Sequence, residues 1–123
     1  MQATFAILIL LALTGCGDVT TRFSTLADAK AQGAFDRGWL PPLLPASARA
    51  IVEHNDLDLN TGTGSFHFEL PERSAYIESL SRAGAVSRFE GDSDILTVAT
   101  NGSRWEIRLP RTSGLAEWSM RPL

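Results

Sequence analysis

The chain has little cysteine, little lysine and no long apolar run, and each shortage excludes a class of protein. Cys16 is the single cysteine among 123 residues, so an intramolecular disulfide and a cysteine-rich zinc site are excluded. Lys30 is the single lysine, and ten arginines are scattered among acidic residues at a net charge of −3, which gives no clustered cations for a nucleic-acid partner. The longest uncharged apolar run covers residues 5–13. As a helix it would reach about 13 Å, too short for a hydrocarbon core of roughly 30 Å.

That apolar run has the features of an export signal. An apolar core of this length near the start of a chain, followed by small residues, is typical of a secretory signal peptide. The next residues, Leu13-Thr14-Gly15-Cys16, resemble the lipobox of bacterial lipoproteins: an aliphatic residue, two small residues and the cysteine that receives lipid. Two alternatives stay open, a plain secretory signal beside a free cysteine, and an N-terminal helix packed in the core.

The lipobox resemblance implies a location. It implies cleavage of residues 1–15, diacylglycerol on Cys16 and usually an acyl chain on the new amino group. The membrane is then the first partner, bound through covalent lipid, and the domain belongs to the cell envelope and faces the periplasm. The resemblance does not choose between the inner and the outer membrane.

The rest of the chain predicts one α+β domain. A chain with 44% hydrophobic and 20% charged residues has the composition of an ordinary globular protein with one core. Residues 16–22 are polar and lack helical periodicity, so we expect a lipidated tether there and a single globular domain over residues 23–123. We expect an antiparallel sheet of about four to six strands with two short helices on one face.

Local signals place these elements. Thr25 and Gly33 bracket a short helix, and Pro71 and Gly84 bracket a second one. The intervening segment 34–45 contains three prolines, which exclude a regular helix or a central strand and predict an ordered apolar loop. The expected strands cover residues 50–59, 65–70, 87–90, 95–100, 103–109 and 115–120, with turns at 61–64 and at Asn101-Gly102.

No constellation of residues predicts catalysis. Asp56, Asp58 and Asn60 offer oxygen atoms at alternate positions, but a calcium loop starting at Asp56 would need glycine and an acidic residue where Thr61 and His67 stand. His54 and His67 could bind zinc only with further ligands, which the spacing does not bring together. We therefore expect no enzyme, no cofactor and no metal, with Asp56, Asp58 and Asn60 as the solvated end of a strand.

A second resemblance covers about 25 residues. Arg37-Gly38-Trp39-Leu40-Pro41, Leu44-Pro45, Ser47-Ala48 and the acidic segment 54–60 resemble a family of small uncharacterised bacterial proteins, many of them lipoproteins, that share a pattern close to RGWLP, LP, SA and HDLDTN. Two residues depart from that pattern: Asn55 separates His54 from Asp56, and Leu59 replaces a threonine. The resemblance implies that the loop and the acidic strand belong to one site. The alternative is that Trp39 and Leu40 only cap the core.

Two functions follow as hypotheses. The first is a non-enzymatic interaction or accessory module that binds another envelope protein through the proline-rich loop. The second is a domain that binds a small ligand or a cation. The candidate residues are Arg37, Trp39, Leu40, His54, Asp56, Asp58 and Asn60, beside Cys16 for lipid attachment.

Overall fold

A computed structural model describes residues 17–100 and 102–123. Within these residues the chain forms seven strands, two α-helices and one short 3-10 helix. In chain order they are β1 (Asp18–Thr25), α1 (Leu26–Ala31), β2 (Arg49–Asp56), β3 (Thr61–His67), the 3-10 helix η2 (Leu70–Glu72), α2 (Arg73–Arg82), β4 (Val86–Glu90), β5 (Ser93–Thr100), β6 (Ser103–Pro110) and β7 (Leu115–Pro122). In this part of the chain, no helix is long and apolar enough to cross a bilayer.

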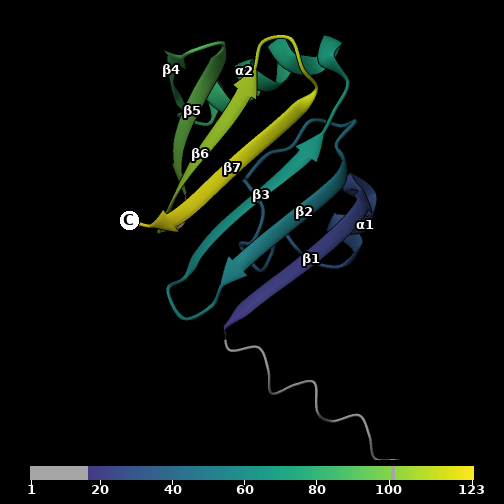
Figure 1. The fold of residues 1–123 in the computed structure, drawn as a ribbon, viewed down its shortest axis with the longest axis vertical. Helices are drawn as coiled ribbons and strands as arrows, with labels where there is room; N and C mark the ends of the chain where they lie inside the picture. The colour runs from purple at the N-terminus through teal and green to yellow at the C-terminus, as the bar shows by residue number, and fades with distance from the viewer. Residues whose placement is uncertain (1–16, 101) are drawn as a thin grey trace, which may run out of the picture.

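The strands form one antiparallel sheet in the order β1-β2-β3-β7-β6-β5-β4. Two meanders, β1–β3 and β4–β7, therefore meet where β3 pairs with β7. Figure 1 shows α1 and α2 behind the sheet, on the same face. Among the described residues, no helix covers the opposite face, which we call the open face.

The core lies between the sheet and the helical layer. Strand residues alternate between the two faces, and cross-strand partners share a face. Trp105 pairs with Val98, and Ile107 pairs with Leu96 on one side and Trp118 on the other. All five are at most 4% exposed, so these positions form the apolar centre of the sheet.

The proline-rich loop closes the core beside the helices. Leu40 is 2% exposed and belongs to the core, and Leu44 packs against it. The hydroxyl of the buried Tyr76 in α2 donates a 2.8 Å hydrogen bond to the carbonyl oxygen of Leu43. Burial raises the pKa of Tyr76 far above its usual range, which keeps this hydroxyl protonated as a donor.

An ion pair fixes helix α2 to the far end of the sheet. The guanidinium group of Arg73 contacts the carboxylate of Asp94 and also donates to the carbonyl oxygens of Leu109 and Pro110. Both charged side chains are largely buried. The pair therefore joins α2, β5 and β6 at the end of the sheet opposite to the start of β1.

Several sequence predictions are confirmed. The α+β class and the helices on one face are as expected. Thr25 caps α1, since its hydroxyl oxygen accepts a hydrogen bond from the backbone N–H of Asp28. The expected cross-strand pairs of β5 and β6 are present, and Gly102 has the positive φ of +82° that a hairpin turn requires. Asn101 lies outside the described residues.

Three predictions are wrong. The strand expected over residues 50–59 ends at Asp56, and residues 57–60 form the turn that follows it. The sheet has seven strands in the described residues, because residues 18–22, expected as a tether, form most of β1 and pair with β2. Residues 61–64, expected as a turn, begin β3. Residues 18–22 and 61–64 each contain two threonines and little apolar patterning, and pairing with a neighbouring strand outweighs the weak local signals for a tether or a turn.

Candidate functional site

A row of polar side chains crosses the open face on four strands. Thr20 of β1 pairs with His54 of β2, which pairs with Thr63 of β3, which pairs with Ser119 of β7. The Thr20 hydroxyl and Nδ1 of His54 share a hydrogen bond of 2.8 Å. Pairing across strands holds these four side chains side by side on the open face.

The row lies in a hollow of about 560 Å³. Its side chains come from the ends of β1, β2, β3 and β7 that lie nearest the N-terminal segment. Those from the open face are Asp18, Thr20, His54, Asp56, Thr61, Thr63 and Ser119. Hydroxyl groups, an imidazole and two carboxylates offer both hydrogen-bond donors and acceptors, which suits a polar ligand.

Asp56 is partly committed to the backbone. Its Oδ1 accepts hydrogen bonds from the backbone N–H groups of Asp58, at 3.0 Å, and Leu59, at 3.1 Å. Asn60 completes the turn with a φ of +55°, a left-handed conformation that asparagine tolerates better than most residues. Asp56 therefore shapes the β2–β3 turn as well as lining the hollow.

Arg37 and Trp39 lie in the helical layer. The guanidinium carbon of Arg37 lies 4.8 Å from the centre of the Trp39 ring, a cation–π contact, and its Nη1 donates to the carbonyl oxygen of Gln32. Burial raises the pKa of Glu53, and the charge of Arg37 lowers it in part, so Arg37 lies near the core-facing side of β2. His54 follows Glu53 in the strand and points to the opposite face.

The structure therefore divides the predicted site residues among three places. His54 and Asp56 meet in the hollow, Asp58 and Asn60 stand in the turn beside it, and Arg37 and Trp39 lie in the other layer. Leu40 is buried and unavailable to a partner in this structure. Cys16 lies outside the described residues. Within the described residues, no three of His, Cys, Asp and Glu are grouped so that they could hold a metal ion.

Glu53 is a buried carboxyl group that the sequence did not reveal. Its side chain is 0% exposed, and among the described residues neither carboxylate oxygen has a hydrogen-bond partner of ordinary geometry. Burial raises the pKa of Glu53 to about 7, although Arg37 and the Thr21 hydroxyl lower it in part. Ile51 and Val52 are both apolar and point to opposite faces of β2, so the sequence did not show which face is buried.

Glycines in β3 make room for large neighbours on the core side. A Cβ on Gly64 would lie 2.2 Å from the Trp118 ring and 2.4 Å from the carbonyl oxygen of Val52. A Cβ on Gly62 would lie 2.5 Å from Oδ1 of Asn55. The sequence Thr-Gly-Thr-Gly thus combines small core-facing positions with threonines that face the hollow.

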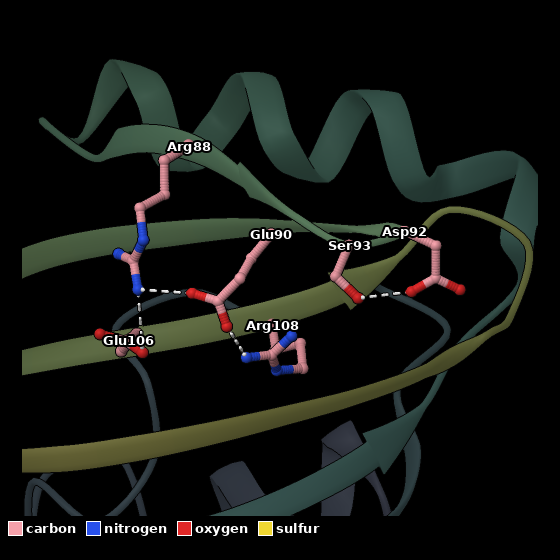
Figure 2. Close-up of polar contacts among 6 residues, drawn as sticks. All are labelled: Arg88, Glu90, Asp92, Ser93, Glu106 and Arg108. Atoms are coloured by element: carbon pink, nitrogen blue, oxygen red, sulfur yellow. Dashed lines mark hydrogen bonds and ion pairs between the residues drawn. The ribbon is translucent and has the colours of Figure 1, made fainter.

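The other side of the open face carries charges in pairs. Arg88 of β4 lies 3.3 Å from Glu90 and 3.5 Å from Glu106 of β6, and Arg108 lies 2.6 Å from Glu90 (Figure 2). The Arg108 guanidinium group, as a hydrogen-bond donor and a nearby charge, lowers the pKa of Glu90. The charges balance one another across β4 and β6, so this region presents no strong field of either sign.

One comparison with known proteins gives a match. Residues 18–67 match the family described as the YbbD head domain, which points to a small bacterial family. The matched segment covers β1, α1, the proline-rich loop, β2 and β3, and so contains most of the residues that line the hollow. No curated protein and no solved structure matches the chain.

Proposed function

We propose that the protein is a lipid-anchored, non-enzymatic interaction module of the cell envelope, which contacts another envelope protein through the open face of its sheet. Cys16, in the lipobox-like sequence Leu13-Thr14-Gly15-Cys16, is the proposed site of the lipid. Strand β1 begins at Asp18, two residues later, so the lipid would hold the sheet close to a membrane.

The observation that carries the proposal is the open face itself. Strands β1–β7 lie side by side, and both helices lie on the other face (Figure 1). The open face is polar, and its ion pairs on β4 and β6 are about half exposed. Balanced charges and short hydroxyl side chains are compatible with the polar surface of a non-obligate partner. The proline-rich loop is the weaker candidate, because Leu40 is buried.

Site-specific photo-cross-linking in cells tests this surface. A cross-linking amino acid at Thr63, exposed on β3, should capture one defined envelope protein. The same amino acid at Ser74, exposed on the opposite layer in α2, is the matched control. Capture from residue 63 alone would support the proposal, and equal capture from both positions, or capture from residue 74 alone, would contradict it.

Mass spectrometry of the protein from membranes tests the anchor separately. A diacylglycerol-modified N-terminal peptide beginning at residue 16 is expected. An unmodified cysteine in a soluble, exported protein would overturn the anchor and leave the contact surface to be judged by the cross-links.

A second candidate function is the binding of a small polar ligand in the hollow. The observation that favours it is the convergence of His54 with three hydroxyl side chains, Thr20, Thr63 and Ser119, in a space of about 560 Å³. This chemistry suits a neutral polyhydroxylated molecule such as a saccharide. A saccharide that shifts the NMR signals of the His54 ring, but leaves those of His67, which is also exposed, in place, would support it; simultaneous shifts of both would contradict it.

A further inference from the structure

The turn between β2 and β3 lies directly against the residue that follows Cys16. The backbone N–H of Leu57 donates a 2.6 Å hydrogen bond to the carbonyl oxygen of Gly17. The carboxylate of Asp58 also approaches Gly17, where an added Cβ would lie 2.5 Å from Oδ2. Because consecutive Cα atoms are about 3.8 Å apart, a lipid on Cys16 would bring this turn to the surface of the membrane.

The turn presents two leucines to solvent. Leu57 is 52% exposed and Leu59 is 66% exposed. The turn is already ordered by hydrogen bonds. The carboxylate of Asp56 accepts them from the backbone N–H groups of Asp58 and Leu59, and the carbonyl oxygen of Gly17 accepts one from the N–H of Leu57. Insertion of the two leucines into an apolar phase therefore requires little further ordering of the backbone.

We propose that the β2–β3 turn, residues 57–60, is a membrane-docking element whose two leucines enter the interfacial region of the bilayer that holds the lipid of Cys16. This inference rests on the proposed lipid anchor. The bilayer is the occupant because the described chain begins at Gly17 against the turn, so acyl chains on Cys16 would bring a bilayer within reach of the turn. The anchor holds the domain, and the leucines fix its orientation.

The charge immediately around Gly17 and the turn adds a direction to the proposal. Asp18 and Asp58 flank Gly17, and Asp56 lies in the turn. Three carboxylates repel anionic headgroups, and salt screens this repulsion. The docked state is therefore favoured on zwitterionic lipid and weakened by anionic lipid at low ionic strength, which is opposite to the behaviour of a basic membrane-binding segment.

Docking also positions the hollow. Asp18 and Asp56 line it from the strand ends nearest Gly17, while Ser119 comes from β7. A docked turn would set the hollow just above the headgroups, with the open face rising from the membrane. The charge pairs of β4 and β6 lie at the opposite side of the sheet, farther from the anchor.

The experiment uses the full-length protein, purified with its lipid and reconstituted into phosphatidylcholine vesicles. A small environment-sensitive fluorophore is attached to a new cysteine, either Leu59→Cys or Phe89→Cys. Phe89 is a matched control, because it is 68% exposed and stands in β4, beside the hairpin turn at the far end of the sheet. We expect a severalfold rise in emission and quenching by lipid-borne quenchers for the label at residue 59, and neither change for the label at residue 89.

Further variants separate the leucines from the label and from the anchor. Leu57→Ser in the protein labelled at residue 59 should remove most of the rise, whereas an unchanged rise would mean that the fluorophore inserts by itself and would overturn the proposal. Equal emission at residues 59 and 89 in a protein whose mass confirms the lipid would overturn docking and leave the anchor standing. Absence of the lipid from the mass would overturn both. Added phosphatidylglycerol should lower the signal at low salt, and a rise instead would contradict the role of the aspartates.

Discussion

Strands β5–β7 and strands β1–β3 share one sheet and one helical layer, yet they fill their core-facing positions differently. In β5–β7 most of these positions hold large apolar side chains, among them Leu96, Trp105 and Ile107, and the buried Asp94 is paired with Arg73. In β2 and β3 they include a buried glutamate, a buried asparagine and two glycines, at Glu53, Asn55, Gly62 and Gly64. The first region follows the ordinary rules for a stable sheet, and the second departs from them.

The departures coincide with three other features of the N-terminal region. The hollow around His54, the exposed leucine turn and the match to the YbbD head domain all lie within or beside β1–β3. Proteins commonly break rules of local consistency at functional sites and gain their stability elsewhere. The comparison therefore points to β5–β7 as the region that stabilises the domain and to β1–β3 as the region that bears the hollow and the proposed docking turn.

The largest effect should come from the apolar region. Ile107 is 0% exposed and packs between Leu96 and Trp118. Ile107→Ala should lower the free energy of unfolding by about 4 kcal/mol, because it removes buried methyl groups and leaves a cavity. Urea unfolding followed by tryptophan fluorescence measures the change. A loss below about 1 kcal/mol, which is typical of a substitution as small as Ile→Val, would show that this region is not the stabilising one.

A change of opposite sign is expected at Glu53. Its pKa of about 7 in the folded protein lies above the ordinary 4.5, so the folded state binds the proton more tightly than the unfolded state. Stability is therefore fully present below pH 4.5, falls as the pH rises towards 7 and levels off above, by roughly 3 kcal/mol in total. Glu53→Gln should abolish this slope and stabilise the protein at pH 8.

Unfolding in urea at a series of pH values tests that prediction. Glu117→Gln, an exposed position on β7, serves as the control and should keep the slope of the wild type. A wild-type stability that stays flat between pH 4.5 and 7 would mean that Glu53 is charged and paired in the folded protein. The N-terminal region would then no longer differ from the C-terminal region by an unpaired buried carboxyl group.

An intermediate effect is expected at Gly64. A Cβ at this position would meet the Trp118 ring and the carbonyl oxygen of Val52 at under 3.0 Å, so the strands must shift. Gly64→Ala should cost about 2 kcal/mol, in the range of overpacking in a core. Gly91→Asn is the control, because nothing lies within 4 Å of its Cβ and asparagine tolerates its φ of +64°. Thermal unfolding by circular dichroism compares the two, and equal melting temperatures would contradict the packing argument.

The sequence predicted the C-terminal half better than the N-terminal half, because apolar alternation is strong in the first and weak in the second. In β5 and β6, strict alternation around Asn101-Gly102 fixes the register, and the pairs of Val98 with Trp105 and of Leu96 with Ile107 are confirmed. At the start of β1 and of β3, threonine and glycine carry no apolar alternation, so residues 18–22 were expected as part of a tether and residues 61–64 as a turn. Those strands exist because β2 and β7 pair with them, which local patterns do not report.

The candidate site was predicted in part. The sequence singled out His54 and Asp56, and the structure places both in the hollow. It did not identify Thr20, Thr63 or Ser119, because a hydroxyl residue has no motif of its own and only strand pairing brings these three beside His54. Glu53 escaped notice for a related reason, since no local signal says that a charged residue between Val52 and His54 points inward.

The smallest effect is expected on the charged part of the open face. Arg88 bridges Glu90 and Glu106, but all three side chains are about half exposed, so water and salt screen the pairs. Arg88→Gln should leave the free energy of unfolding at neutral pH close to that of the wild type. A large loss, measured in urea as for Ile107→Ala, would show that this surface also stabilises the domain.

The charged part of the open face should also make stability depend on pH, with a sign opposite to that of Glu53. The pKa of Glu90 is lowered in the folded protein, so its stabilising effect is present above pH 4.5 and is lost as the pH falls through the lowered pKa. Because Glu53 gains stability on acidification from pH 7 to 4.5 and Glu90 loses it below, the two groups together favour a maximum of stability near pH 4.5. Arg108→Gln removes the donor closest to Glu90 and should flatten only the acid side of this maximum, whereas Glu53→Gln should flatten only the other. If Arg108→Gln instead changed the slope between pH 4.5 and 7, the two halves of the sheet would be electrostatically coupled, and the division of stability and function between them would fail.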